Sequence, residues 1–276
     1  MLFPTHDKLN WSVRQESILT ESGIEVPKYN AIVREDTNKV LSVMGSDYYP
    51  YQNSELIALL ERVSNQTGME VKNSGSFGDG QKVFIQLKSN DLKLGNDRIE
   101  GYLTGINSYD GSTSLAFGPS NVTISCQNTF YAAFRDMNNK VRHTKNMVIK
   151  IDDICKGLED LVKEEKKIFD NIIKLSETRF DSAIQESVTR KLFDVKKEFK
   201  LNDEKLSTQT KNKLSRFHVN LHGEISEKGE NLWGLFSGIT KYTSHSISNE
   251  YSGESKMLSV YSERERKIFN ELCELV

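Results

Sequence analysis

The sequence changes character near residue 150, and this change limits the folds that the chain can adopt. Before it, glycine, asparagine, serine and aromatic residues are frequent and the apolar runs are short. After it, lysine and glutamate alternate over long stretches, and apolar residues recur every three or four positions. Short apolar runs between turn residues are typical of strands, whereas the second pattern is typical of amphipathic helices. We therefore predict an α+β domain over residues 1–150 and a helical region over residues 151–276 that packs on it.

The first half is predicted to contain a mostly antiparallel sheet with helices. Its short runs of valine, isoleucine, phenylalanine and threonine indicate strands at Ala31–Arg34, Val40–Gly45, Lys82–Leu87, Ile99–Ser108, Ser114–Gly118 and Val122–Cys126. A helix is expected to begin after a cap at Ser54 and to end at Gly68, because serine suits the first position and glycine the last. A second helix is predicted after Asn128, with Phe130, Ala133, Phe134 and Met137 on its buried side.

The second half is predicted to be helical throughout. Ile154, Leu158, Leu161, Phe169, Ile172 and Leu175 form one apolar stripe at helical spacing. In residues 180–199, apolar residues continue to recur at helical spacing. Further helices are expected around Trp233–Tyr242 and from about Ser262 to Leu275.

Charge and cysteine content exclude some classes of protein. The 37 lysines and arginines nearly balance 39 acidic residues, and the net charge of -2 excludes a histone-like polycation. A local basic groove remains compatible with a neutral particle. The three cysteines, Cys126, Cys155 and Cys273, are widely spaced, which favours a reducing compartment without disulfides or a structural zinc site. With no signal peptide and no apolar run long enough to cross a membrane, the chain is predicted to be cytoplasmic and to have no membrane association.

The first basic window has no acidic residue between Asp136 and Asp152. Its basic residues are Lys140, Arg142, His143, Lys145 and Lys150. Cations on one edge attract phosphates and release counterions from nucleic acid, so we predict that Arg142, His143 and Lys145 bind a phosphate backbone. The alternative is a solvated connector whose positive charges lie beside acidic neighbours.

The second basic window lies between Glu204 and Glu224, which enclose no other acid. It contains Lys205, Lys211, Lys213, Arg216, His218 and His222. Serine and threonine are frequent at its start, and hydroxyl groups with cations suit contact with phosphates rather than with bases. We predict binding by Lys211, Lys213 and Arg216, and the alternative is an exposed loop between helices.

Three tyrosines surround a proline immediately before the first predicted helix. Aromatic faces stack on unpaired bases, so Tyr49 and Tyr51 are candidates for such a platform, together with Tyr48. The alternative is that the tyrosines bury against the sheet and satisfy their hydroxyls there.

No recognised catalytic arrangement is present, and we predict a protein that is not an enzyme and that has no cofactor. His218 and His222 have a spacing that can bind zinc on a helix, but the pattern lacks a third ligand. Asp36 and Asp110 could share a divalent metal, although Asp110 precedes glycine as a tight turn requires. The glycine-rich stretch 75–80 matches neither a P-loop nor a dinucleotide fingerprint.

Several short elements resemble one known family. They are Trp11–Val13, Arg34–Thr37, Tyr49–Asn53, Asn107–Ser112, Cys126–Thr129, Arg142–Thr144 and Trp233–His245. In this order they resemble a domain of unknown function found in phage- and plasmid-encoded proteins. In the tyrosine element, Pro50 precedes Tyr51 and the spacing is one residue shorter than in the family.

The resemblance implies a gene of a phage or mobile element, often located beside replication and recombination genes. A further similarity to single-strand annealing proteins implies that a sheet-and-helix module binds DNA. The leading hypothesis is therefore a protein that holds single-stranded DNA, promotes annealing or recombination without catalysis, and forms a homo-oligomer in the host cytoplasm. The alternatives are an interaction protein that binds a host factor through its helical half, and a metal-dependent enzyme that uses Asp36 and Asp110.

Overall fold

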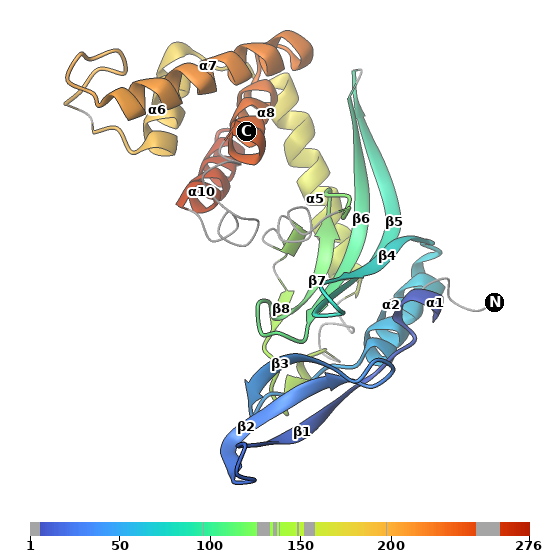
Figure 1. The fold of residues 1–276 in the computed structure, drawn as a ribbon. Helices are drawn as coiled ribbons and strands as arrows, with labels where there is room; N and C mark the ends of the chain where they lie inside the picture. Colours follow the sequence, from blue (N-terminus) through green and yellow to red (C-terminus); the bar gives the residue numbers. More distant parts are fainter. Residues whose placement is uncertain are drawn as a thin grey trace. The chain divides into compact units, whose positions relative to one another are not determined.

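The structure is a computed structural model of the whole chain, and it describes residues 6–95, 97–125, 133–134, 137, 139–147, 149–151, 158–196, 198–246 and 260–276. The chain divides into two compact units. The first comprises Met1–Leu92 with Ile99–Glu165, and the second comprises Lys93–Arg98 with Lys166–Val276. Strands lie in the first part of the chain and long helices in the second, so the predicted α+β class is confirmed (Figure 1).

The first part of the chain contains two sheets, a short helix and a longer helix. Its elements are α1 (His6–Leu9), β1 (Val13–Leu19), β2 (Glu25–Arg34), β3 (Lys39–Gly45), α2 (Asn53–Thr67), β4 (Val71–Phe77), β5 (Lys82–Leu94), β6 (Asp97–Ser108), β7 (Leu115–Ser120) and β8 (Asn139–Val141). β1, β2 and β3 form a three-stranded antiparallel sheet in that order, and β4 to β8 form a five-stranded sheet in sequence order. Sequential strand order is the simplest result of short turns between neighbouring strands.

The core of the first unit forms where α2 meets the five-stranded sheet. Leu56, Ile57, Leu59, Leu60 and Val63 are all buried on one side of α2, as their spacing predicts. The helix approaches β6 closely, because a Cβ atom at Gly105 would lie 3.0 Å from the side chains of Leu56 and Leu60. A larger residue at Gly105 would therefore separate the helix from the sheet.

The ends of α2 confirm one predicted cap and correct the other. Gly68 ends the helix with a φ of 74°, and its N–H donates to Ser64 O at 2.8 Å. The start is not capped by Ser54. Gln52 is the N-cap and forms a capping box with Glu55, so the helix begins one residue before Ser54.

The prediction of a strand at Val122–Cys126 is wrong for residues 122–125, and Cys126 lies outside the described residues. The side chain of Gln86 takes the place of strand pairing. Its amide nitrogen donates to Val122 O at 2.9 Å, and its oxygen accepts from Ile124 N at 2.8 Å. The segment is therefore held by one glutamine rather than by a backbone ladder.

The strands β1, β4 and β8 were not predicted, because their sequences are mainly polar. Of the helix predicted after Asn128, Ala133 and Phe134 are helical and buried, whereas Met137 is buried but is not part of a helix. Phe130 lies outside the described residues. β8 is the last strand of the five-stranded sheet and pairs Val141 with Leu115.

The second part of the chain consists of helices, as predicted. They are α5 (Leu158–Glu177), α6 (Ser182–Phe193), α7 (Thr208–Lys228), α8 (Leu232–Lys241), η1 (Tyr242–Ser246) and α10 (Val260–Glu274). Phe217, Leu221, Leu235, Ile239 and Leu272 belong to one core that joins α7, α8 and α10. Each helix among the described residues is too short or too polar to cross a lipid bilayer.

Candidate nucleic-acid interface

The segment after β8 places part of the first basic window in water. Val141, His143 and Met147 are buried, whereas Arg142, Thr144, Lys145 and Asn146 are exposed. Two turn hydrogen bonds fix this alternation: Thr144 N donates to Arg142 O, and Met147 N donates to Thr144 O, both at 2.9 Å. Among the described residues, no carboxylate lies within ion-pair distance of Arg142 or Lys145.

The tertiary structure brings this segment against the tyrosine-rich segment. Tyr49 N donates to His143 O at 3.2 Å, and His143 Nδ1 donates to Tyr49 O at 3.3 Å. The rings of Tyr48 and His143 lie 4.9 Å apart. The tyrosine segment and the first basic window, whose residues 49 and 143 are 94 positions apart in the sequence, are therefore neighbours.

The three tyrosines differ in what they can present to a ligand. Tyr51 is only 5% exposed, and its hydroxyl donates to Glu55 O at 3.2 Å. The hydroxyl of Tyr48 donates to Ser108 O at 2.7 Å, and burial raises the pKa of Tyr48. Tyr49 is half-buried, and the charge of Glu55 is the main cause that raises the pKa of Tyr49. Tyr49 is thus the better placed of the two predicted stacking residues.

His143 serves as an anchor of the loop. It is 8% exposed, and burial lowers the pKa of His143 to about 4, so the ring is neutral near pH 7. Because Nδ1 donates to a carbonyl, Nε2 carries the lone pair, and Nε2 is buried without a hydrogen-bond partner in the described residues. The positive charge at this segment therefore comes from Arg142 and Lys145.

Two side-chain amides, of the half-buried Gln52 and the buried Asn107, support the tyrosine segment. The side chain of Gln52 pairs with Val13 as a strand would, with both the N–H and the carbonyl of Val13 at 3.0 Å. Asn107 Nδ2 donates to Tyr51 O at 2.7 Å. These contacts hold residues 51 and 52 against β1 and β6, and so fix the position of the neighbouring Tyr49.

A buried polar chain continues from this support to Trp11. Tyr109 Oη donates to Asn53 Oδ1 at 2.9 Å, and Asn53 Nδ2 donates to Trp11 O at 3.1 Å. The rings of Trp11 and Tyr109 lie 5.6 Å apart. Most of the sequence elements that carry the family resemblance thus meet in this region, where they position the backbone.

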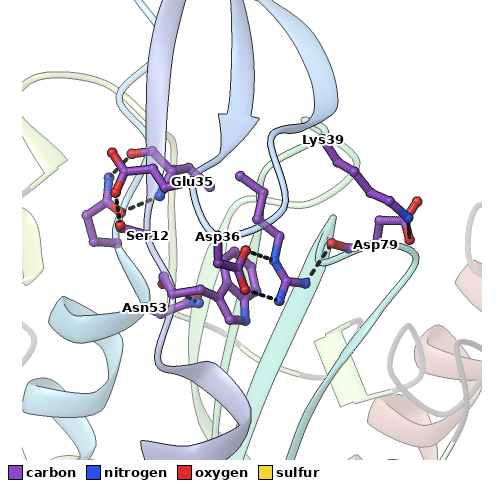
Figure 2. Close-up of polar contacts among 10 residues, drawn as sticks. Ser12, Glu35, Asp36, Lys39, Asn53 and Asp79 are labelled. Atoms are coloured by element: carbon purple, nitrogen blue, oxygen red, sulfur yellow. Dashed lines mark hydrogen bonds and ion pairs between the residues drawn. The ribbon is translucent and has the colours of Figure 1, made fainter.

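Asp36 and Asp79 lie in two turns that an arginine joins, and Figure 2 shows the polar contacts around these two residues. Arg34 donates to both carboxylate oxygens of Asp36, at 2.6 and 2.8 Å, and to Asp79 O at 2.9 Å. Its guanidinium lies 4.2 Å over the ring of Trp11. The hydrogen bonds from Arg34 are the main cause that lowers the pKa of Asp36. The contacts bind the turn after β2 to the turn after β4.

Gly80 allows this approach. It has a φ of 112°, and a Cβ atom there would lie 2.8 Å from the Trp11 ring and 3.1 Å from Arg34 Nη1. Both the conformation and the space require glycine at this position.

The two carboxylates of the metal hypothesis are each bound to a cation. Asp36 accepts from Arg34, and Asp110 accepts from the buried Lys82 at 2.6 Å. Asp110 also accepts from Ser112 N at 3.0 Å, as a turn residue does. Within the described residues, no group of three histidine, cysteine, aspartate or glutamate side chains could hold a metal ion. The role of Lys82 was not anticipated from the sequence, because its partner Asp110 lies 28 residues away.

The second basic window lies in the other unit, mainly on α7. Ser207 caps the helix by accepting from Thr210 N at 3.1 Å, and Leu214, Phe217 and Leu221 form its buried side. Lys211 and Arg216 are exposed. Lys211 Nζ donates to Glu204 O at 2.7 Å. Of the three cations predicted here, Lys213 is half-buried and lies 5.6 Å over the ring of Tyr261.

Two further exposed residues lie on the same side of α7 as Arg216. Arg216, Val219 and His222 are spaced by three positions, so they lie on one side of the helix. The side chain of Val219 is 72% exposed. Burial and the charge of His222 lower the pKa of His218, which favours the neutral imidazole there.

The comparisons with known proteins give one match. The family described as "Domain of unknown function (DUF932)" matches residues 40–267, which include both basic windows and the tyrosine segment. No curated protein matches the chain. No solved structure matches it either. Because the family pattern extends over most of its length, the chain belongs to the DUF932 family.

Proposed function

We propose that the protein belongs to a phage or mobile element, binds single-stranded DNA without catalysing a reaction, and promotes annealing or recombination. Phosphates would contact Arg142 and Lys145, and an unpaired base would stack on Tyr49. Lys211 and Arg216 would supply phosphate contacts from α7. His143 and Tyr51 are buried, hold the binding segments in place and need not contact the DNA strand.

One observation carries the proposal. The reciprocal hydrogen bonds between residues 49 and 143 hold the segment that carries the exposed Arg142 and Lys145 against the backbone of the half-buried Tyr49. Cations that follow the backbone and an aromatic ring that accepts a base are the two parts of sequence-independent binding to single strands. The absence of acidic residues between Asp136 and Asp152 leaves the sequence on both sides of these cations without a negative charge.

The strength of binding should depend on salt. Each neutralised phosphate on a single strand contributes about 0.7 to the slope of log K against log salt, so four contacts predict a slope of about -3. Fluorescence anisotropy of a labelled oligothymidine across a salt series measures this slope. A slope near zero, or no binding at low salt, would contradict the proposal.

Paired variants separate the site from general charge effects. Arg142→Glu with Lys145→Glu should weaken binding at least about tenfold, because two phosphate contacts become repulsive. Lys72→Glu with Lys93→Glu changes the net charge equally at two other exposed positions and should have a much smaller effect. Equal losses in the two double variants would show that only the total charge matters.

Tyr49→Leu tests the stacking contact. Loss of one stacked base should weaken binding by about 1–3 kcal/mol without changing the salt slope. Tyr49→Phe keeps the ring and should bind as the unchanged protein does. If Tyr49→Leu also binds unchanged, the aromatic contact is removed from the proposal.

A further inference from the structure

The three-stranded sheet carries apolar residues of β2 and β3 on both of its faces. We define its outer face by Tyr29, Ala31, Val33, Val40 and Val43. The strand registers place Ala31 between Glu16 and Val43, and Val33 between Arg14 and Val40. Side chains at directly paired positions share a face of the sheet, so these residues lie together.

The other face of the same sheet already forms part of the core. Val13, Ile32 and Leu41 are buried there. Sheets that have one face in water normally alternate apolar and polar residues, whereas strands covered on both faces are apolar in succession. Ala31–Val33 in β2 and Val40–Leu41 in β3 follow the second pattern, whereas the first half of β2 is mainly polar.

The outer face is partly open to solvent in the single chain: Val33 is buried, at 3% exposed, and Ala31 is half-buried, whereas the other three side chains are exposed. Tyr29 is 52% exposed, Val40 61% and Val43 55%. Leu19 and Ile24, near the turn between β1 and β2, are also exposed. Among the described residues, most of the large hydrophobic side chains with high exposure therefore belong to this sheet and its turn. Such a concentration marks an interaction surface.

The charges beside this face favour a second copy of the same chain as its partner. Arg14 and Glu16 lie side by side on β1, with Arg14 Nη2 2.7 Å from Glu16 Oε1. In a two-fold dimer the same surface meets itself, so each residue i that contacts j is matched by j contacting i. An adjacent cation and anion can then face the anion and cation of the partner, whereas a patch of one sign would repel its copy. We infer that the outer face joins two copies of the protein.

The size of the face sets the expected strength of the dimer. Three strands spaced by about 4.8 Å and about ten residues of β2 give a face of about 14 by 33 Å, or roughly 450 Å² per copy. Two such faces bury less than the roughly 1,200 Å² of a stable complex. The dimer is therefore reversible and depends on concentration. It does not use the residues proposed to bind DNA, so either proposal can fail alone.

Sedimentation velocity over a concentration series tests the dimer directly. We expect monomer at about 5 µM and a growing dimer fraction toward about 200 µM. Val40→Glu with Val43→Glu should remain monomeric throughout, because carboxylates would face each other across the interface. Val219→Glu, at an exposed apolar position on α7, is the matched control and should dimerise as the unchanged protein does.

Mixing two charge variants gives a second readout that a folding defect cannot imitate, because Arg14 and Glu16 also pair within one chain. Arg14→Glu and Glu16→Arg should each abolish the dimer alone by placing like charges together, and mixing the two variants should restore a dimer that contains one copy of each. Far-UV circular dichroism checks each fold, and Val40→Thr with Val43→Thr keeps the branched shape if the glutamate variant unfolds. A monomer at every concentration, or a dimer that survives both the glutamate and the threonine variants, would overturn the inference.

Discussion

Adjacent residues of one basic window have opposite environments. Arg142 and Lys145 are exposed, whereas the intervening His143 is 8% exposed and bonded to Tyr49. From the sequence alone, the three residues of this basic run are equivalent candidates for binding phosphate. The tertiary structure separates them into cations that can meet a phosphate and a neutral ring that holds the loop.

His143 makes the stability of the first unit depend on pH. The pKa of His143 is about 4 in the fold and about 6.5 when unfolded, so the unfolded chain binds more protons between these values. The stabilising contribution is fully present above about pH 6.5 and is lost as the pH falls toward 4. At about pH 5 the loss amounts to about 2 kcal/mol.

Urea unfolding at about pH 7.5 and about pH 5 measures this dependence. His143→Gln, which cannot titrate, should show a smaller difference between the two pH values than the unchanged protein. An equal difference in both proteins would assign the pH dependence to other groups.

At the scale of elements, side chains replace backbone pairing at two places. Gln52 bonds both backbone groups of Val13, and Gln86 bonds Val122 and Ile124. Both glutamines satisfy groups that a neighbouring strand would otherwise satisfy. Residues 122–125 have the sequence of a strand, but Gln86 bonds Val122 and Ile124 in place of a ladder.

The turn after β4 should tolerate no side chain at Gly80. Gly80→Ala should destabilise the first unit by about 2 kcal/mol or more, because the left-handed conformation is strained and the methyl group meets Trp11. Gly23→Ala is the matched control. Gly23 has a φ of 80° with no atom within 4 Å of the added Cβ, so this variant reports the conformational strain alone.

Chemical unfolding of both glycine variants gives the comparison. The loss in Gly80→Ala should exceed the loss in Gly23→Ala by the contribution of the steric contact with Trp11 and Arg34. Equal losses would mean that the turn moves freely away from Trp11, and the proposed fixation of the two turns by Arg34 would be wrong.

At the scale of the whole molecule, each unit has its own core. Leu60 belongs to the cluster of the first unit, and Leu235 belongs to the cluster of the second. Both side chains are completely buried. Separate cores allow one unit to lose stability while the other keeps its packing.

Large-to-small variants in the two cores should act in different units. Leu60→Ala and Leu235→Ala should each cost about 2–5 kcal/mol in their own unit. Hydrogen exchange measured by mass spectrometry should show faster exchange in α2 for the first variant and in α7 and α8 for the second. Leu275→Ala, at an exposed position, is the control. Faster exchange throughout the chain in either core variant would indicate a single cooperative unit.

The sequence by itself determined the α+β class, the helical second half, the apolar side of α2 and its end at Gly68. These features depend on residues close together in the chain, where periodicity and glycine conformations act directly. The boundary at residue 150 and the binding roles of the cations stay predictions. The polar strands β1, β4 and β8 could not be predicted, because their pairing is decided by distant neighbours rather than by their own residues.

Only the tertiary structure decided which candidate residues meet. It joined residues 49 and 143, placed Tyr51 and His143 inside, and bound Asp36 and Asp110 to Arg34 and Lys82. It also left the outer face of the three-stranded sheet exposed. The physical reason is common to all of these features: burial and pairing depend on groups that are far apart in the chain, and a local pattern contains no information about their distance in space.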